Sequence, residues 1–388
     1  MISCMFDDND SRRQFLKGSG VTVAALSGLA GCTGEDGDPS EAPSDDGEEL
    51  TQREQWDEKF GEFDPENHQE TLPHAMPVLY DHDLHRITVE ELNDIEEQDE
   101  PHHGGPVWEK DDDEEWMEPD FLQFSIAPDE ETAVYREAYD EFLDNIEDET
   151  GLHVEFTELQ SFAAEVEAMR SERLHIAAFS TGTVPYAVNL AGAVPYAIMV
   201  DEQENQTLWG VRNWLIAHID NDDITELADI AGKDVAHTSP SSNSGHQAPS
   251  ALYTELGVEP DVDYEIEFSG AHEQSAIGVE IGDYDAAPTC SGCPERFAEN
   301  DLIDLDSFRV VESVGQFMPR GFSYYYRLHP DIQEGIERAA YDYDYSGTPM
   351  DTDLDLGNRF VEIDYKTHWD THLVIQEFLD VEYDEPPS

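Results

Sequence analysis

A loop rich in hydroxyl and amide side chains is the first segment of this sequence that could do chemistry. Ser242, Asn243 and Ser244 stand before Gly245 in SPSSNSGHQAP, residues 239–249. The loop lies between a predicted strand and a predicted helix, where unpaired backbone N–H groups and the helix dipole favour an anion. The sequence predicts that these neutral donors alone hold a small oxyanion. The alternative is that they are ordinary capping and turn residues.

Two further groups are candidates for ligand contacts. His272 stands at the start of another predicted helix, where its ring could face a ligand or pack at the surface. Cys290 and Cys293 form the sequence C-S-G-C just after a predicted strand, at the sheet edge where open α/β sheets bind ligands. This pair is compatible with a small disulfide, half of a metal site or a redox dithiol, and the disulfide is the simplest reading.

The charge of the chain restricts its partners. Of 388 residues, 91 are Asp or Glu and 19 are Lys or Arg, so the formal net charge is −72. The acids are spread through a sequence that is 38% hydrophobic, which is typical of a folded protein with an anionic surface, as in halophiles. Nucleic acid is not expected as a partner, because phosphate backbones require basic patches. We expect a monomer.

The N-terminal residues predict export. The stretch SRRQFLK, residues 11–17, resembles the twin-arginine signal and precedes an apolar stretch, residues 21–30, that is too short to span a bilayer as a mature helix. The sequence LAGC that ends at Cys32 resembles a lipobox. We therefore interpret residues 1–31 as a signal peptide and Cys32 as a lipidated residue that anchors the protein at the outer face of the cell membrane. A buried N-terminal helix is the alternative.

Two segments without a regular pattern follow the signal. Residues 32–50 are rich in Gly, Asp, Pro and Ser and are expected to be disordered. Residues 51–119 form an irregular acidic extension, in which His82 and His85 could bind a metal if they shared a helix face. A solvated extension is favoured, because no second ligand pair has a diagnostic spacing. We predict no metal site and assign this segment no function. Its histidines are His68, His74, His82, His85, His102 and His103.

Strands and helices alternate after residue 120. Predicted strands cover residues 121–127, 153–157, 176–179, 234–237, 264–268 and 285–288. Predicted helices cover residues 132–147, 162–173, 184–190, 245–256, 273–281, 331–341 and 367–379. This alternation predicts parallel sheets with helices on both faces. We expect two α/β lobes, residues 120–213 with 322–388 and residues 214–321, joined by a hinge that permits closure around a ligand.

Several short motifs resemble the phosphate-, phosphite- and phosphonate-binding components of ABC transporters. In chain order they are LADIAGKDVA (residues 227–236), SNSG (242–245) and SGAHE (269–273), and residues 162–179 with the Pro-Tyr pair at 185–186 look like that family's first lobe. The resemblance covers about residues 121–328. It implies a two-lobed, type II periplasmic-binding-protein fold that closes over its ligand, with no catalytic residue and no cofactor.

The resemblance also implies ligand-binding residues. In that family a Ser-Thr-Ser-Gly loop and a His on the opposite turn hold the phosphonate oxygens, and these roles fall on Ser242, Asn243, Ser244 and His272. Phe162 stands where the family commonly has a ligand-facing Tyr. Further candidates are Gly245 and Thr181.

The sequence departs from the family at two acidic positions. The C-S-G-C loop takes the place of one acid and Arg320 that of another. In relatives that take aminoalkylphosphonates such acids pair with the ligand amine, so an amine-bearing ligand is not expected. A guanidinium suits a more anionic or carboxylated ligand.

The sequence thus predicts an exported, lipid-anchored solute-binding protein that captures a small oxyanion for an ABC permease. Three alternatives remain open at this point. The same fold could bind another organic or carboxylated ligand. An extracellular metal- or thiol-dependent protein could use Cys290 and Cys293, and a metal-sequestering protein could use the histidines of the extension.

Overall fold

The computed structural model describes residues 63–65, 67–93, 95–126, 136–204, 206–354 and 356–387. The signal segment, Cys32 and the predicted linker lie outside the described residues, so the predictions made for them stay predictions. The chain divides into two compact units, residues 1–71 and 72–388. The described part of the first unit contains the short helix η2 (His68–Thr71). Both sheets belong to the second unit.

The first lobe is built on an eight-stranded sheet. Its strands are β2 (Ile87–Thr88), β3 (Leu122–Ile126), β4 (Val154–Phe156), β5 (Ile176–Phe179), β6 (Ala193–Glu202), β7 (Thr207–Trp209), β13 (Gly321–Tyr325) and β14 (Arg359–Glu362). The order is β2-β7-β6-β13-β5-β3-β4, and β14 pairs with β6. The prediction of a parallel sheet is correct only for β3, β4 and β5. The remaining pairs are antiparallel. Strand β13 returns from the second lobe and runs against both β5 and β6, while β7 and β14 run against β6 and β2 runs against β7.

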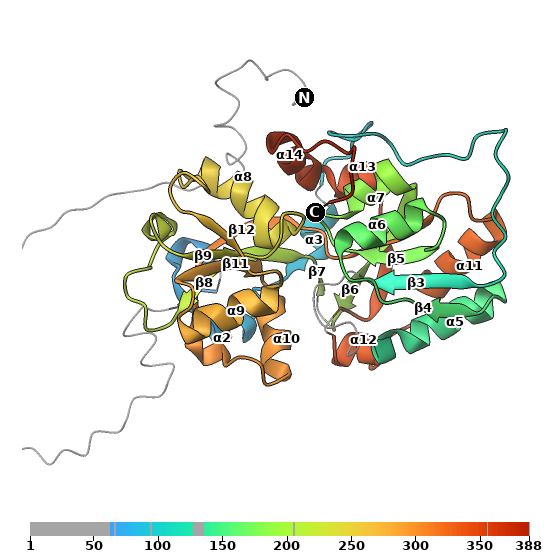
Figure 1. Cartoon of the computed structure of the whole chain (residues 1–388). Coiled ribbons are helices and arrows are strands. Elements are labelled where there is room, and N and C mark those ends of the chain that lie inside the picture. The colour runs from blue at the N-terminus through green and yellow to red at the C-terminus, as the bar shows by residue number, and fades with distance from the viewer. Residues whose placement is uncertain are drawn as a thin grey trace, which may run out of the picture. The chain divides into compact units, whose positions relative to one another are not determined.

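Helices cover both faces of the first sheet, with α6 and α7 on one face and α5 on the other (Figure 1). The helices of this lobe are η3 (Arg136–Tyr139), α5 (Asp140–Thr150), α6 (Phe162–Arg170), α7 (Val184–Ala191), α11 (Pro330–Tyr341), α12 (Pro349–Thr352), α13 (Tyr365–His368) and α14 (Asp370–Phe378). Helix α5 buries Phe142, Leu143 and Ile146, at the spacing of one helix face. Phe142 stacks on Phe360 with ring centroids 5.0 Å apart, which joins α5 to β14 in the core.

The second lobe is built on a six-stranded sheet with the order β1-β12-β8-β11-β9-β10. Its strands are β1 (His74–Ala75), β8 (Val211–His218), β9 (Val235–His237), β10 (Ile266–Phe268), β11 (Ala286–Cys290) and β12 (Phe308–Phe317). Its helices are η4 (Leu227–Ile230), η5 (Asn243–Gln247), α8 (Ala248–Glu255), α9 (His272–Ile281), α10 (Cys293–Glu299) and η6 (Leu305–Ser307). Strands β9, β10 and β11 are parallel, whereas β8 and β12 run against their neighbours. Helix α8 lies on one face and α9 and α10 on the other (Figure 1).

The chain crosses between the lobes at two adjacent segments. The first crossing is Gly210, between β7 and β8, and the second is residues 318–320, between β12 and β13. Val211 and Phe317 pair across the crossings. Gly210 has φ +67°, and a Cβ atom there would collide with the carbonyl oxygen of Phe317. Glycine is therefore required both for its backbone conformation and for the close approach of the two segments.

The N-terminal extension contacts both lobes. It contributes α2 (Met76–Tyr80) and α3 (Val89–Asn93), while β1 pairs with β12 of the second lobe and β2 with β7 of the first. These contacts could not be predicted from the sequence, because a two-residue strand is too short to show an alternating pattern. Within the described residues, none of the helices combines the length and the apolar character needed to cross a membrane.

Candidate functional site

A pocket of about 120 Å³ lies at the two crossings and is lined by residues of both lobes and of the extension. Ser180 and Thr181 come from the end of β5 in the first lobe, and His85 and Arg86 come from the extension. The second lobe contributes the loop that follows β9 and the loop that follows β11. The pocket is smaller than the roughly 300–1,000 Å³ of sites that bind drug-sized molecules, so it suits a small ligand.

The hydroxyl-rich loop lies where the sequence placed it, between β9 and a helix. Ser242 is the N-cap of η5, and its Oγ atom accepts a hydrogen bond of 3.1 Å from the backbone N–H of Gly245. The first turn is a π-helix rather than an α-helix, because Gln247 donates its backbone N–H to the carbonyl of Ser242, five residues earlier. Ser242, Asn243 and Ser244 line the pocket. Gly245 is buried beneath them against Thr238, where a Cβ atom would not fit.

Asn243 has a buried side-chain amide without a hydrogen-bond partner in the described part of the chain, which indicates a ligand contact. The residue is 6% exposed, and neither its Oδ1 nor its Nδ2 atom has a hydrogen-bond partner among the described residues. An amide buried without a partner costs about 1–3 kcal/mol, so native proteins rarely retain one without a reason. Because Asn243 lines the pocket, a bound ligand could supply the missing partner. The amide offers two donors and one acceptor, which suits an oxyanion.

His272 also lines the pocket, but its ring is already engaged by hydroxyl groups. Its Nδ1 atom lies 3.2 Å from the Oγ1 atoms of both Thr238 and Thr289. Its Nε2 atom lies 3.2 Å from Ser242 Oγ. The ring therefore ties the loop after β9 to β11, and it orients Ser242 from the first residue of α9.

The remaining predicted site residues differ in position. Thr181 lines the pocket, and its hydroxyl donates to the carbonyl oxygens of Met318 at 2.6 Å and Pro319 at 3.2 Å, which holds the second crossing. Arg320 lines the pocket from the same crossing. Phe162 is the first residue of α6, is half-buried, and is not among the residues that line this pocket.

The structure adds to the pocket two arginines that were not predicted as site residues from the sequence. Arg86 and Arg296 line the pocket together with Arg320, and none of the described lining residues is Asp or Glu. Arg86 is held by Asp201 of β6 at 3.3 Å. Arg296, on α10, donates to the carbonyl oxygen of Gly292 at 2.8 Å. The lining of the pocket is therefore not made of neutral donors alone, because segments far apart in the sequence bring three guanidinium groups to it. Which of these donors contact the ligand stays a prediction.

The pKa of His85 is affected by the burial and the positive charge of this pocket. Burial of the imidazole, followed by the charges of Arg86 and Arg296, lowers the pKa of His85 to about 3. The ring is therefore neutral near pH 7, and the arginines supply the positive charge. One feature of the sequence could have drawn attention to these arginines. Only 19 Lys and Arg occur in 388 residues, so each basic residue in such an acidic chain is a candidate for a specific role.

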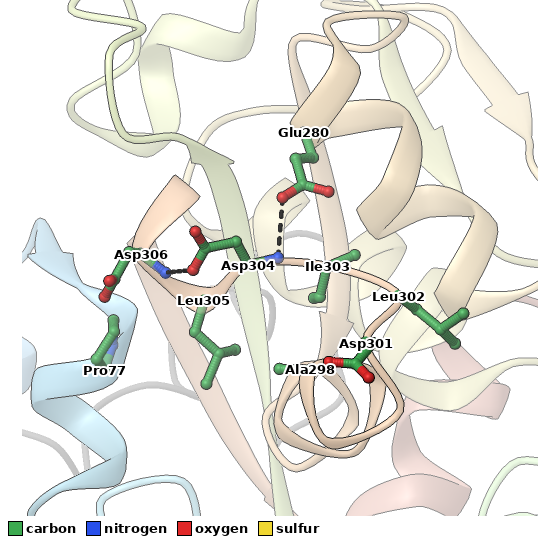
Figure 2. Close-up of a pocket in the computed structure, with 9 residues that line it drawn as sticks. All are labelled: Pro77, Glu280, Ala298, Asp301, Leu302, Ile303, Asp304, Leu305 and Asp306. Carbon is green, nitrogen blue, oxygen red and sulfur yellow. Dashed lines mark hydrogen bonds between the residues drawn. The ribbon is translucent and has the colours of Figure 1, made fainter.

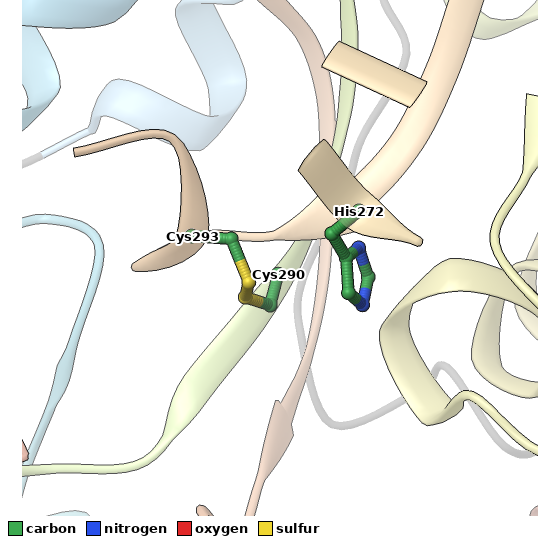
Figure 3. Close-up of side chains that lie close together, drawn as sticks. All are labelled: His272, Cys290 and Cys293. Carbon is green, nitrogen blue, oxygen red and sulfur yellow. A yellow bond between two sulfur atoms is a disulfide. The ribbon is translucent and has the colours of Figure 1, made fainter. Parts of the chain in front are cut away.

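The C-S-G-C loop forms a disulfide between Cys290 and Cys293, which is one of the three states that the sequence left open. Both cysteines line the pocket beside His272 (Figure 3). Ser291 of this loop donates to the carbonyl of His85, and Tyr80 donates to the carbonyl of Ser291. The loop thus holds the extension against the second lobe.

A second hollow on the second lobe has the opposite character. It is lined by Glu280, Asp301, Asp304 and Asp306 (Figure 2). Glu280 and Asp304 accept backbone hydrogen bonds from Asp304 and Asp306, respectively. Carboxylates gathered in this way repel anions. Of the two, the pocket at the crossings is the one suited to an oxyanion.

Comparisons with known proteins agree with this geometry. The family model described as "ABC transporter, phosphonate, periplasmic substrate-binding protein" matches residues 124–369. The phosphate-import protein PhnD of Mycolicibacterium smegmatis is 30% identical over 176 residues, which is 43% of this chain and 54% of that protein. The chain thus matches about half the length of that relative.

Solved structures show the same fold. A binding-protein component of an ABC phosphonate transporter from Pseudomonas aeruginosa has a TM-score of 0.58 at 17% identity, covering 69% of this chain and 90% of that one. PhnD1 of Prochlorococcus marinus, in complex with methylphosphonate, has a TM-score of 0.58 at 15% identity, covering 68% of this chain and 99% of that one. The predicted two-lobed, type II periplasmic-binding-protein fold is confirmed.

Proposed function

Because the chain belongs to the family of periplasmic phosphonate-binding components of ABC transporters, we propose that it captures a phosphonate-, phosphite- or phosphate-like oxyanion outside the cell and delivers it to a membrane permease. The protein binds and releases the ligand without changing it. Closure of the two lobes about the crossings at Gly210 and residues 318–320 encloses the ligand.

One observation supports an anionic ligand above all others. Arg86, Arg296 and Arg320 line a pocket whose described lining contains no carboxylate, in a chain with 91 acidic and 19 basic residues. Guanidinium groups bind phosphoryl and carboxylate oxygens through paired hydrogen bonds. The side chains of Asn243 and Ser244 supply further donors at the start of η5.

The same lining argues against an amine on the ligand. An ammonium group would need a carboxylate partner, and the described lining offers none. The small volume of the pocket favours inorganic phosphate, phosphite or a short alkylphosphonate over a larger organic ligand. The named ligands of the two relatives, phosphate for one and methylphosphonate for the other, are of this size.

The location and organisation of the protein are part of the proposal. Lipidation at Cys32 anchors a monomer at the outer face of the cell membrane after removal of residues 1–31. The sequence placed the lobe boundaries at residues 213/214 and 321/322. The crossings at Gly210 and residues 318–320 move them slightly, so the proposed lobes are residues 120–209 with 321–388 and residues 211–317, and residues 51–119 form the extension. The acidic surface suits an environment of high salt. Replacing Cys32 by Ser should release the exported protein into the medium, which cell fractionation would detect.

Calorimetry and thermal unfolding in molar KCl test the ligand class. Phosphate, phosphite and methylphosphonate should bind and raise the melting temperature with the logarithm of their concentration. Binding should persist because the Debye length at 1 M salt is about 3 Å, so distant surface acids are screened while direct contacts remain. 2-Aminoethylphosphonate should bind more weakly than methylphosphonate. A panel in which a dicarboxylate binds and every phosphorus oxyanion fails would reject the proposal.

A further inference from the structure

The side chains of His272, Cys290 and Cys293 lie close together (Figure 3). All three residues line the pocket, so they form one corner of it. One ring nitrogen of His272 and the sulfur atoms of Cys290 and Cys293 all lie within 4.8 Å of one another. His272 is 5% exposed and Cys293 2%, whereas Cys290 is half-buried, so two of the three groups are shielded from bulk solvent. Two cysteines and one histidine are a common set of protein ligands for Zn²⁺.

We propose that reduction of the Cys290–Cys293 disulfide converts this corner into a binding site for a soft divalent metal ion such as Zn²⁺, held by both sulfurs and by His272. The disulfide form has no thiolate and does not bind the ion. The redox state of the two cysteines would therefore decide whether the pocket contains a metal.

The reductant required is a dithiol, and the step balances as a thiol–disulfide exchange. One thiolate of the dithiol attacks a protein sulfur and forms a mixed disulfide, while the other protein sulfur leaves and takes up a proton. The second thiol of the reductant then displaces the protein and closes its own disulfide. Two electrons and two protons reach Cys290 and Cys293. Metal binding releases the two thiol protons and leaves two thiolates on the ion.

The surroundings of the group favour such a site. The Nη2 atom of Arg296 lies 3.5 Å from Cys293 Sγ, so its charge stabilises the thiolate form. Both ring nitrogens of His272 face hydroxyl groups, Nδ1 those of Thr238 and Thr289 and Nε2 that of Ser242. The ion would replace the contact at one nitrogen, and the contact at the other nitrogen would orient the ring. Two thiolates neutralise the charge of Zn²⁺, which offsets the repulsion between the ion and the arginines that line the pocket. Three protein ligands leave a fourth coordination position open toward the pocket.

Cobalt spectroscopy on the full chain tests the site. We would replace Cys4 and Cys32 by Ser, so that only Cys290 and Cys293 supply thiols. The protein is reduced with dithiothreitol, desalted without oxygen and titrated with Co²⁺ in molar KCl free of phosphate. The reduced protein should bind one Co²⁺ with thiolate-to-cobalt absorption that Zn²⁺ abolishes, and the oxidised protein should show none. Reduced protein with two free thiols and no such absorption would overturn the proposal.

Variants test the role of the histidine. His272→Asn should weaken Co²⁺ binding by at least about tenfold. The matched control is His153→Asn, because His153 is exposed and lies outside the group, and it should bind as the parent does. Unchanged Co²⁺ affinity in His272→Asn would exclude His272 as a ligand and overturn the three-ligand site. Should that variant fail to fold, the comparison of reduced and oxidised parent still decides the question. The readout contains no oxyanion, so it does not depend on the proposed transport function.

Discussion

Gln376 of α14 donates a hydrogen bond of 3.0 Å to the Oε1 atom of Gln247 in η5. The same Nε2 atom lies 3.0 Å from the carbonyl oxygen of Gly182, at the start of the turn that leads into α7. Gln376 and Gln247 are buried, and the hydroxyl of Tyr383 donates to the Oε1 atom of Gln376. One amide therefore connects the first lobe to the helix that begins at the hydroxyl-rich loop.

Replacing Gln376 by Ala should weaken oxyanion binding. This contact joins the two lobes, so bringing the lobes of the variant together would bury Gly182 O and Gln247 Oε1 without this donor, which costs about 1–3 kcal/mol, or roughly five- to 150-fold in affinity. Isothermal titration calorimetry with phosphate measures the change. The matched control is Gln333→Ala, because Gln333 donates only to backbone carbonyls within the first lobe. Equal losses of affinity in both variants would show that the effect is a general loss of stability.

Replacing Asn243 by Ala should separate ligand affinity from stability. The side-chain amide of Asn243 has no hydrogen-bond partner among the described residues, so the ligand-free variant should unfold at the same denaturant concentration or higher. A hydrogen bond to a charged ligand is worth about 1.5–3 kcal/mol, so affinity should fall roughly ten- to 150-fold.

Asn213→Ala is the contrast for this experiment. Asn213 is fully buried, donates to the carbonyl oxygen of Ser244 at 2.5 Å and accepts from Tyr253 at 2.8 Å. Its replacement should lower the free energy of unfolding by about 1–3 kcal/mol. A loss of stability in Asn243→Ala as large as in Asn213→Ala would contradict the role assigned to Asn243.

Replacing Arg296 by Gln should lower oxyanion affinity by roughly ten- to 150-fold even in molar salt, because the guanidinium acts at contact distance. Arg86→Gln should do the same, and it would also leave the carboxylate of Asp201 without this cation near the pocket. Arg338→Gln is the control, since Arg338 is exposed and pairs with Glu149 at 2.8 Å. Affinities measured at several KCl concentrations would show whether the loss survives screening. A loss that disappears at 1 M salt would mean that these arginines act only at long range.

The buried histidine of β9 should make stability depend on pH. Burial, followed by the charge of His246, lowers the pKa of His237 to about 3. Below the ordinary pKa of 6.5 the unfolded chain takes up a proton that the native ring does not, so the free energy of unfolding falls as pH decreases from 6.5 toward 3. The slope for one such group is about 1.4 kcal/mol per pH unit.

Denaturant unfolding between pH 7 and 4.5, at constant molar salt, checks this dependence. His237→Gln should lose less stability over this range than the parent. His153→Gln, which changes an exposed histidine, should keep the slope of the parent. A parent and a His237→Gln variant with the same slope would show that His237 is protonated in the native protein.

Much of the secondary structure could be predicted from the sequence. The predicted strand at residues 176–179 is β5, and the predicted helix at residues 273–281 is α9 to within one residue. These elements carry their pattern in adjacent residues. Strands β8 and β12 were not assigned, because long buried strands lack the alternation that marks a half-exposed strand. Part of the predicted helix at residues 132–147 lies outside the described residues, and α5 covers the rest from Asp140.

The sequence alone determined the two-lobed fold, the place of the hydroxyl-rich loop at a helix start, and the family, because each depends on patterns within short segments. The tertiary structure decided the charge of the pocket. Arg86, Arg296 and Arg320 come from the extension, from α10 and from the second crossing, and only the order of the strands and the two crossings bring them together. It also decided the part played by His272, whose ring faces three hydroxyl groups from two separate segments, the loop after β9 and strand β11. Contacts between segments so far apart leave no periodic signal in the sequence.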